Sequence, residues 1–184
     1  MNAIPQAIPD VLLIEPEVFG DERGFFYESF NARRFAQALG WPVEFVQDSH
    51  SRSGGGVLRG LHYQIQHPQG KLVRVIAGSV YDVAVDLRRG SPTFGQWVGH
   101  VLSSENRQQM WIPPGFAHGF LALSETAEFV YKSTDYYHPE HERCIAWDDP
   151  QLAIAWPLNE APVLSARDQR GTSFAQAEIY HLVL

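Results

Sequence analysis

The chain has 184 residues, a mass of 20.8 kDa and one cysteine, Cys144, so it is long enough for one well-filled domain and cannot hold an internal disulfide framework or a thiolate metal cluster. Hydrophobic residues make up 45% and charged residues 19% of the chain, a balance that leaves no room for a long disordered tail. The formal net charge of −7 argues against binding of nucleic acid polymers, which needs a basic surface. We expect residues 1–184 to form a single domain.

The sequence carries no sign of export or of membrane insertion. The first ten residues, MNAIPQAIPD, lack a basic region followed by an apolar run, and no stretch of eighteen apolar residues occurs. A single cysteine agrees with a reducing compartment. We therefore predict a cytoplasmic protein without a membrane partner.

One helix is predicted near the N-terminus. Asn31 has a side chain suited to capping a helix start, and Gly40 is suited to ending the helix. Phe35 and Leu39 lie four positions apart, which places them on one face of the helix.

The rest of the chain is typical of short strands. The 15 glycines and 12 prolines are spread along its whole length and divide it into short segments. Several segments alternate in the manner of strands: Val73 with Val75, Val83 with Val85, and Phe129 with Tyr131. The turn Gly78-Ser79 predicts a hairpin between residues 71–77 and 80–88, because glycine supplies the positive φ of a two-residue turn. The pattern favours an all-β fold, a barrel or double-sheet jelly roll with one or two short helices.

A first group of polar residues lies between positions 47 and 75. It contains His50, Arg59, His62 and Lys71. Arg59 and His62 are separated by an odd number of positions, so on a regular strand they would point to opposite faces. Both can reach one pocket only if the strand bulges, and Gly60 is where we place the bulge. If the strand has no bulge, we expect His62 to be a hydrogen-bonded core residue and Arg59 to be a surface charge.

A second group surrounds His118. Pro113, Gly115 and His118 fit the P-x-G-x-x-H pattern of the second cupin motif. Metal-binding cupins add a His-x-His pair and a carboxylate from the first motif. Here that stretch offers His62 without a second imidazole, and Lys71 brings a cation nearby, so we predict no metal and no other cofactor. His67 precedes Pro68 in a predicted loop and is a weak substitute ligand.

With these residues in place, the chain closely resembles the dTDP-4-dehydrorhamnose 3,5-epimerase family, the metal-free cupin sugar-nucleotide epimerases. The resemblance covers nearly the whole chain and depends on the order and spacing of eight segments: DERGFFYESF (21–30), QDSHS (47–51), LRGLHYQ (58–64), QGKLVRV (69–75), GSVYDVAVDLR (78–88), PPGFAHGF (113–120), VYKSTDYY (130–137) and LSARDQ (164–169).

The resemblance implies a cupin-type jelly roll and a set of catalytic residues. His62 would be the general base, Asp168 the carboxylate that orients it, and Tyr131 the acid that returns a proton from the opposite face. Lys71 would stabilise the enolate oxygen, with His118 or Arg59 nearby. The implied substrate is a dTDP-linked 4-keto-6-deoxyhexose, epimerised at C3 and C5.

The same resemblance implies substrate contacts and an assembly. The contacts would be Arg23, Glu28, Gln47, Asp48, Ser49, Arg59, His118, Glu142 and Arg167. The family usually has Asn at position 49 and Lys at position 167, so Ser49 and Arg167 put two contacts in doubt. A homodimer is implied, with N-terminal strands crossing between subunits.

Three other functions remain open at this stage. A mono-epimerase would invert only C3 or only C5 of a related sugar. A metal-dependent cupin enzyme would need ligands that the motif lacks. A sugar-binding module without catalysis would have no use for an acid and a base across its pocket.

Overall fold

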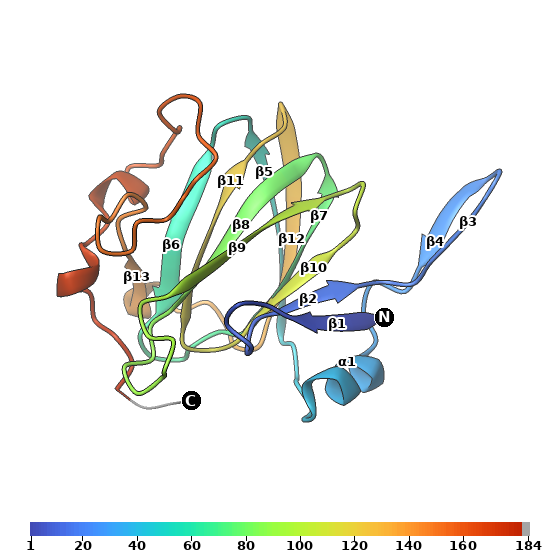
Figure 1. Cartoon of the computed structure of the whole chain (residues 1–184), viewed down its shortest axis with the longest axis horizontal. Helices are drawn as coiled ribbons and strands as arrows, with labels where there is room; N and C mark the ends of the chain where they lie inside the picture. Colours follow the sequence, from blue (N-terminus) through green and yellow to red (C-terminus); the bar gives the residue numbers. More distant parts are fainter. Residues whose placement is uncertain (182–184) are drawn as a thin grey trace.

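The computed structural model describes residues 1–181, and it consists mainly of antiparallel strands (Figure 1). The larger sheet has the order β1 (Asn2–Pro5), β2 (Leu12–Glu15), β10 (Gln109–Ile112), β7 (Lys71–Ala77), β12 (Thr126–Ser133) and β5 (Gln47–Gly54). The second has the order β13 (Glu142–Cys144), β6 (Leu58–Gln64), β11 (Phe116–Ala122), β8 (Ser79–Asp86) and β9 (Trp97–Ser103). The predicted all-β jelly roll is confirmed.

The structure of residues 71–88 differs from the hairpin that the sequence predicted. β7 pairs with β10 and β12, whereas β8 pairs with β11 and β9, so the predicted hairpin does not exist. Gly78 has a φ of 74°, as the turn requires, but it carries the chain from one sheet to the other. A Cβ atom at this position would lie 2.1 Å from the carbonyl oxygen of Thr126, so only glycine fits the crossing.

The core lies between the two sheets. Val73 and Phe129 reach it from the larger sheet, and Val80 and Phe120 reach it from the second sheet. The rings of Phe120 and Phe129 stack with their centroids 4.4 Å apart. Of the alternating pairs predicted from the sequence, Val73 and Val75 lie in this core, whereas Val83 and Val85 belong to a second buried cluster that includes Phe174 of the C-terminal segment.

The predicted helix is present as α1 (Ala32–Leu39). The side chain of Asn31 accepts hydrogen bonds from two backbone N–H groups of the first turn, and Gly40 ends the helix with a φ of 87°. Phe35 and Leu39 are buried, and the Phe35 ring meets Trp111 edge-on at 5.4 Å. In residues 1–181 no helix has the length and apolar character needed to cross a bilayer.

Two further segments determine where functional side chains lie. β3 (Val18–Asp21) and β4 (Gly24–Tyr27) form a hairpin that projects away from the sheets (Figure 1). The C-terminal segment, with the short 3₁₀ turns η2 (Asp168–Arg170) and η3 (Phe174–Gln176), packs beside the second sheet. A further 3₁₀ turn, η1 (Pro139–His141), precedes β13.

β6 contains the predicted bulge. His118 of β11 faces His62, yet Phe120 faces Arg59, so β6 holds one residue more than its partner across this interval. Gly60 adopts a φ of 126° within this interval, and a Cβ atom there would lie 2.5 Å from the Cα atom of Gly119. The close approach of the two backbones therefore requires glycine in β6.

Candidate active site

A cavity of about 470 Å³ lies between the two sheets, within the about 300–1,000 Å³ common for ligand pockets. Its walls come from β5, β7 and β12 of the larger sheet and from β6 and β13 of the second sheet. Its lining residues are Gln47, Ser49, His62, Tyr63, Gln64, Gln69, Lys71, Tyr131, Tyr137 and Glu142. Six residues predicted from the sequence thus meet here: Gln47, Ser49, His62, Lys71, Tyr131 and Glu142.

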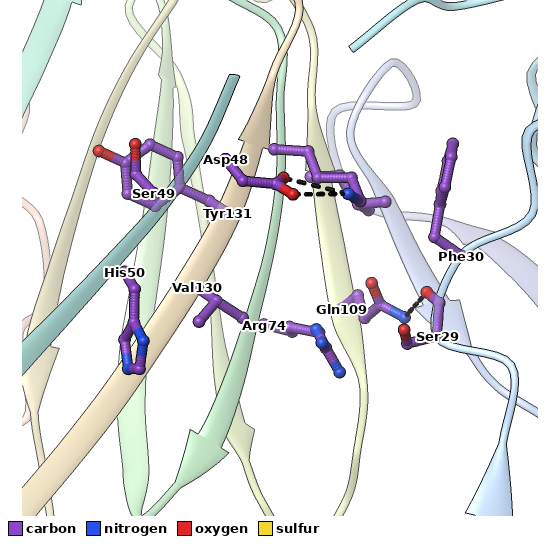
Figure 2. Close-up of a pocket in the computed structure, with 11 residues that line it drawn as sticks. Ser29, Phe30, Asp48, Ser49, His50, Arg74, Gln109, Val130 and Tyr131 are labelled. Carbon is purple, nitrogen blue, oxygen red and sulfur yellow. Dashed lines mark hydrogen bonds and ion pairs between the residues drawn. The ribbon is translucent and has the colours of Figure 1, made fainter. Parts of the chain in front are cut away.

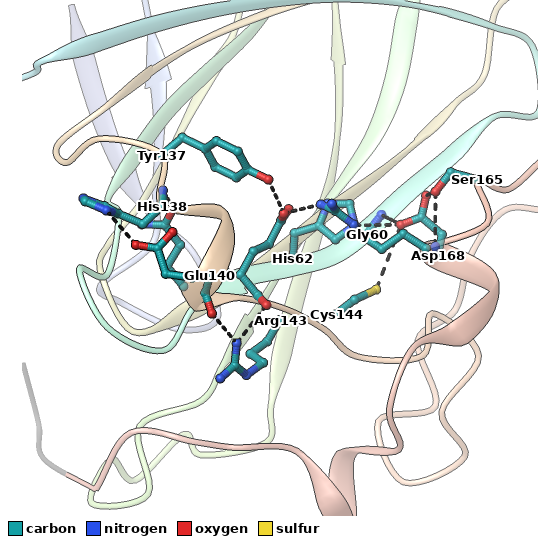
Figure 3. A network of polar contacts seen from close by, with 12 residues as sticks. Gly60, His62, Tyr137, His138, Glu140, Arg143, Cys144, Ser165 and Asp168 are labelled. Atoms are coloured by element: carbon teal, nitrogen blue, oxygen red, sulfur yellow. Dashed lines mark hydrogen bonds and ion pairs between the residues drawn. The ribbon is translucent and has the colours of Figure 1, made fainter.

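His62 forms one wall of the cavity, and Asp168 lies behind it. The Nε2 atom of His62 is 2.6 Å from Oδ1 of Asp168 (Figure 3). The His62 side chain is 27% exposed, whereas that of Asp168 is 3% exposed. One nitrogen of the imidazole is therefore engaged by a buried carboxylate, and the other is free to meet a ligand.

The surroundings of Asp168 keep it ionised. Burial opposes the charge, but the hydrogen bonds that the carboxylate accepts from His62, Ser165 and the backbone N–H of Gly60 outweigh this effect and lower the pKa of Asp168 to about 2. Ser165 donates to Oδ2 at 2.7 Å and also accepts from the Asp168 backbone N–H at 3.2 Å. A carboxylate held in this way fixes the ring orientation of His62 and its tautomer.

Tyr131 and Lys71 belong to the opposite wall, because β12 and β7 lie in the other sheet from β6. The Lys71 ammonium lies 5.7 Å from the centre of the Tyr131 ring. Burial lowers the pKa of Lys71 to about 8, while the charges of Glu142 and Asp82 oppose this effect. Lys71 is therefore mostly protonated at neutral pH, and it loses its proton when the pH rises modestly above neutrality.

Polar residues connect at the cavity rim. Glu142 accepts a hydrogen bond from the Tyr137 hydroxyl and forms an ion pair with Arg167. The Glu142 side chain is mostly buried, whereas Arg167 is exposed. Arg167 is thus tied to the cavity wall through Glu142, although it does not line the cavity itself.

His118 lies deeper than its predicted role as a substrate contact suggested. It is buried, and its Nε2 atom is 2.9 Å from Oδ2 of Asp82. Burial raises the pKa of Asp82, and the nearby His118 and Lys71 partly offset that effect. The pair lies in the barrel interior, close enough to Lys71 to influence its charge, and does not border the cavity.

Four predicted substrate contacts lie away from this cavity within the chain. Arg23 is at the tip of the β3–β4 hairpin, paired with Asp21, and Glu28 follows β4 and accepts from Asn31. Arg59 is bonded to Ser53.

Asp48 is the fourth residue, and it lies on a second cavity. That cavity has a volume of about 490 Å³ and borders β5, β12 and β7. Asp48 forms an ion pair with Lys132 there, with Nζ and Oδ1 3.0 Å apart, and Val130 and Arg74 lie nearby (Figure 2). Its neighbours on β5, Gln47 and Ser49, line the cavity of His62, and Ser49 and Tyr131 border both cavities. His50 also lines this second cavity and pairs with Glu128 at 3.1 Å, but Glu128 is 33% exposed, whereas the carboxylate of Asp168 is buried.

Three residues of the site were not predicted from the sequence. Ser165 locks Asp168, Tyr137 bonds Glu142, and Asp82 pairs with His118. A signal existed for Asp82, because a carboxylate inside the apolar segment VYDVAVD needs a partner when it is buried. Ser165 and Tyr137 lie in loop segments without regular periodicity.

The donor set around His62 is poorly suited to a divalent metal. His62, Cys144 and Asp168 bring one donor atom each within 4.8 Å of one another. However, burial, together with the charges of Asp168 and Glu142, raises the pKa of the Cys144 thiol to about 12, so the thiol stays protonated. The ammonium of Lys71 on the same cavity adds repulsion toward a cation.

Comparisons with known proteins agree with this arrangement. Residues 5–176 match the family model described as dTDP-4-dehydrorhamnose 3,5-epimerase. The chain is 67% identical over 180 residues to the dTDP-4-dehydrorhamnose 3,5-epimerase of Pseudomonas aeruginosa, covering 98% of this chain and 99% of the relative.

Two solved structures are informative. The dTDP-6-deoxy-D-glucose-3,5-epimerase of Legionella pneumophila, in complex with dTDP-4-keto-L-rhamnose, has a TM-score of 0.96 and 56% identity and covers 100% of this chain and 99% of its own. A 3′-monoepimerase from Streptomyces bikiniensis, in complex with dTDP-quinovose, has a TM-score of 0.88 and 35% identity, with coverage of 93% and 87%.

The jelly roll and the acid–base groups around its cavity define a cupin-type sugar-nucleotide epimerase. The family model spans most of the sequence, and the identity to the Pseudomonas aeruginosa enzyme extends over almost the full length of both chains. The chain belongs to the dTDP-4-dehydrorhamnose 3,5-epimerase family. The predictions of an isomerase and of a role in dTDP-rhamnose biosynthesis are confirmed.

Proposed function

We propose that the cavity binds the 4-keto-6-deoxyhexose of a dTDP-linked sugar and inverts both carbons that flank its C4 ketone, C3 and C5. The observation that carries the proposal is that His62, backed by Asp168, and Tyr131 border one cavity from different sheets. Inversion needs this arrangement, because the proton that leaves one face of the ring must be replaced from the other face.

His62 acts as the base in this scheme. Ionised Asp168 holds a proton on Nε2 of the ring, which leaves the Nδ1 lone pair to take a proton from carbon. When the imidazolium forms, the adjacent carboxylate stabilises its charge. The electron pair of the broken C–H bond moves toward the C4 oxygen and gives an enolate.

Lys71 stabilises that enolate. Its ammonium borders the cavity and carries a proton at neutral pH, so it can face the developing negative charge on the C4 oxygen. The pair of His118 and Asp82 acts behind Lys71, where the negative charge of Asp82 favours the charged form of the amine.

Tyr131 completes each inversion by giving its phenolic proton to carbon on the face opposite His62. The enolate electron pair forms the new C–H bond, and the ketone is restored. Exchange with solvent then returns a proton to the Tyr131 phenolate and removes the proton from His62, so that the second carbon can be inverted. Arg167, at the cavity entrance, is placed to meet the diphosphate that leads out of the cavity, and a guanidinium suits forked bonding to phosphate oxygens.

The test is turnover of the keto sugar nucleotide in heavy water, followed by mass spectrometry and NMR. We expect deuterium at both C3 and C5 of the product, because the proton removed by His62 and the proton on Tyr131 exchange with solvent. Deuterium at one carbon alone would show that the protein inverts only that carbon. Product without deuterium would contradict the proposed proton transfers.

We also propose that the protein is a cytoplasmic homodimer in which the β3–β4 hairpin packs on the second subunit. Phe19, Phe25 and Phe26 on this hairpin are 58%, 60% and 71% exposed in the single chain. Aromatic side chains gathered on a projecting arm are typical of a surface that a partner covers. Arg23 at the hairpin tip would then be carried toward the second subunit, which accounts for its distance from the cavity of its own chain.

Light scattering tests this assembly. We expect a mass of two chains for the unmodified protein and of one chain for the Phe25→Ser, Phe26→Ser double variant. An exposed residue elsewhere, Val163→Ser, serves as the control and is expected to stay dimeric. A monomeric unmodified protein would contradict the proposal.

A further inference from the structure

Three histidines that the epimerase scheme does not use gather beside the cavity rim. His67 lies in the segment between β6 and β7, whereas His138 and His141 lie in the segment between β12 and β13. The rings of His67 and His138 stack with centroids 4.3 Å apart, and His141 is 5.6 Å from His67 by the same measure. Residues about seventy positions apart in the sequence thus form one imidazole cluster.

Carboxylates accompany these imidazoles. Asp135 Oδ2 lies 3.5 Å from Nδ1 of His67, and Glu140 Oε1 lies 3.5 Å from Nδ1 of His138 (Figure 3 draws His138 and Glu140). His67, Asp135 and His138 each bring a donor atom to within 4.8 Å of the other two. Two imidazoles and a carboxylate are a donor set that late first-row divalent metals bind.

The donor distances come close to those of a tetrahedral ion, but the stacked rings of His67 and His138, 22° from parallel, must rotate apart so that a nitrogen lone pair of each points at the ion. Bonds of about 2.0–2.1 Å to nitrogen and oxygen place tetrahedral ligands about 3.3–3.5 Å apart. The distance between His67 and Asp135 already equals 3.5 Å. The largest separation in the group, up to 4.8 Å, needs to close by about 1.5 Å, a distance that rotation of partly exposed side chains can cover.

The backbone beneath the cluster is held in place by two buried or half-buried amides. Gln64 donates to the carbonyl of His67 at 2.7 Å and accepts from the backbone N–H of His138 at 2.7 Å. Gln69 donates to the carbonyl of Asp135 at 2.8 Å. His67 has a φ of 55°, a left-handed conformation that a residue with a Cβ keeps only when its surroundings impose it. The backbones of the three donor residues are therefore held in place before any ligand arrives, and only their side chains must rotate.

We propose that His67, Asp135 and His138 bind one divalent late first-row transition metal ion, with Zn²⁺ the best match, and that His141 or water fills the fourth position. Glu140 would support His138 from outside the coordination sphere. The site is separate from the cavity of His62. Gln64 and Gln69 connect the two, because both line the cavity and both also hold the backbone of the metal ligands. The ion would link the two segments at the cavity rim, one containing Gln69 and the other Tyr137. It would take no part in the proton transfers.

Binding of the metal itself tests the proposal. Full-length protein is stripped with a chelator, dialysed and titrated with ZnCl₂ in a calorimeter, and its thermal midpoint is followed with and without Zn²⁺. We expect one ion per chain and a higher midpoint when zinc is present. His67→Gln and His138→Gln should each weaken binding by more than the about 10–100-fold that loss of an outer partner causes.

His50→Gln is the matched control, because His50 is an exposed histidine whose carboxylate partner, Glu128, lies outside the cluster. It should bind zinc as the unmodified protein does. Circular dichroism of each metal-free variant verifies that it is folded, and the double variant Asp135→Asn, His141→Gln provides a second set of substitutions. No binding to the unmodified protein, or binding unchanged in the cluster variants, would overturn the proposal.

Discussion

Nε2 of His62 lies 2.6 Å from Oδ1 of Asp168, although 106 positions separate the two residues in the sequence. The contact exists because the C-terminal segment returns to β6 and places η2 against it. Ser165 and the backbone N–H of Gly60 donate to the same carboxylate, so with His62 it has three hydrogen-bond partners. The base of the proposed reaction is thus assembled by tertiary packing.

Asp168→Asn should lower kcat by about 10²–10⁴-fold, because an amide no longer fixes the tautomer of His62 or stabilises its charged form. Steady-state kinetics with the keto sugar nucleotide measures the effect. Asp148→Asn alters an exposed carboxylate of the same C-terminal region and should retain normal kcat. A folded Asp168→Asn variant with unchanged kcat would contradict the role given to this pair.

Tyr131→Phe should impair inversion more than it impairs proton exchange. The base is intact in this variant, so deuterium from heavy water still enters the substrate, but the donor on the opposite face is missing. NMR of recovered substrate and product separates the two rates. Tyr136→Phe changes an exposed tyrosine and should leave both rates unaffected; equal losses of exchange and inversion in Tyr131→Phe would assign Tyr131 another role.

The turnover rate should fall as pH rises through about 8, where buried Lys71 loses its proton. The sign follows from the proposed chemistry: the charged amine stabilises the enolate, so activity is present below this pKa and is lost above it. Lys71→Arg should move the alkaline fall to higher pH, since a guanidinium stays charged there. An alkaline limb at the same pH in both proteins would exclude Lys71 as its source.

Gly60→Ala should reduce the free energy of unfolding by about 1–3 kcal/mol and also lower kcat. The added Cβ would lie 2.5 Å from the Cα atom of Gly119 and would occupy a backbone with φ of 126°. The strand must then shift, and His62 lies two residues further on. Urea unfolding and kinetics measure both effects; Gly54→Ala, where a Cβ meets nothing within 4 Å, is the control and should match the unmodified protein.

Local chemistry made several elements predictable from the sequence. Asn31 and Gly40 define α1 through hydrogen bonds within a few residues, and alternation along β7 and β12 gave the core positions Val73 and Phe129. The bulge near Gly60 followed from one requirement, the odd spacing of Arg59 and His62. Arg59 nevertheless bonds Ser53 and does not line the cavity.

Features that depend on distant contacts were not predictable in the same way. The turn at Gly78 has the geometry of a hairpin, and nothing within residues 71–88 reveals that the two strands join different sheets. The partnership of Asp82 with His118, and of His67 with His138, appears only when separate segments meet. Family resemblance indicated His62 and Asp168, but the sequence alone held no signal for Ser165 behind them.

The crossing at Gly78 has a consequence for biosynthesis. Strands that follow one another in the chain mostly belong to different sheets. β7 therefore cannot pair until β10 and β12 have been synthesised, and β6 cannot pair until β11 and β13 have been synthesised. Such late pairings slow folding and leave unpaired strand edges exposed until then. A nascent chain halted on the ribosome before residue 126 would lack β12, the strand with which β5 pairs, and shielding by a chaperone should matter most at that stage of translation.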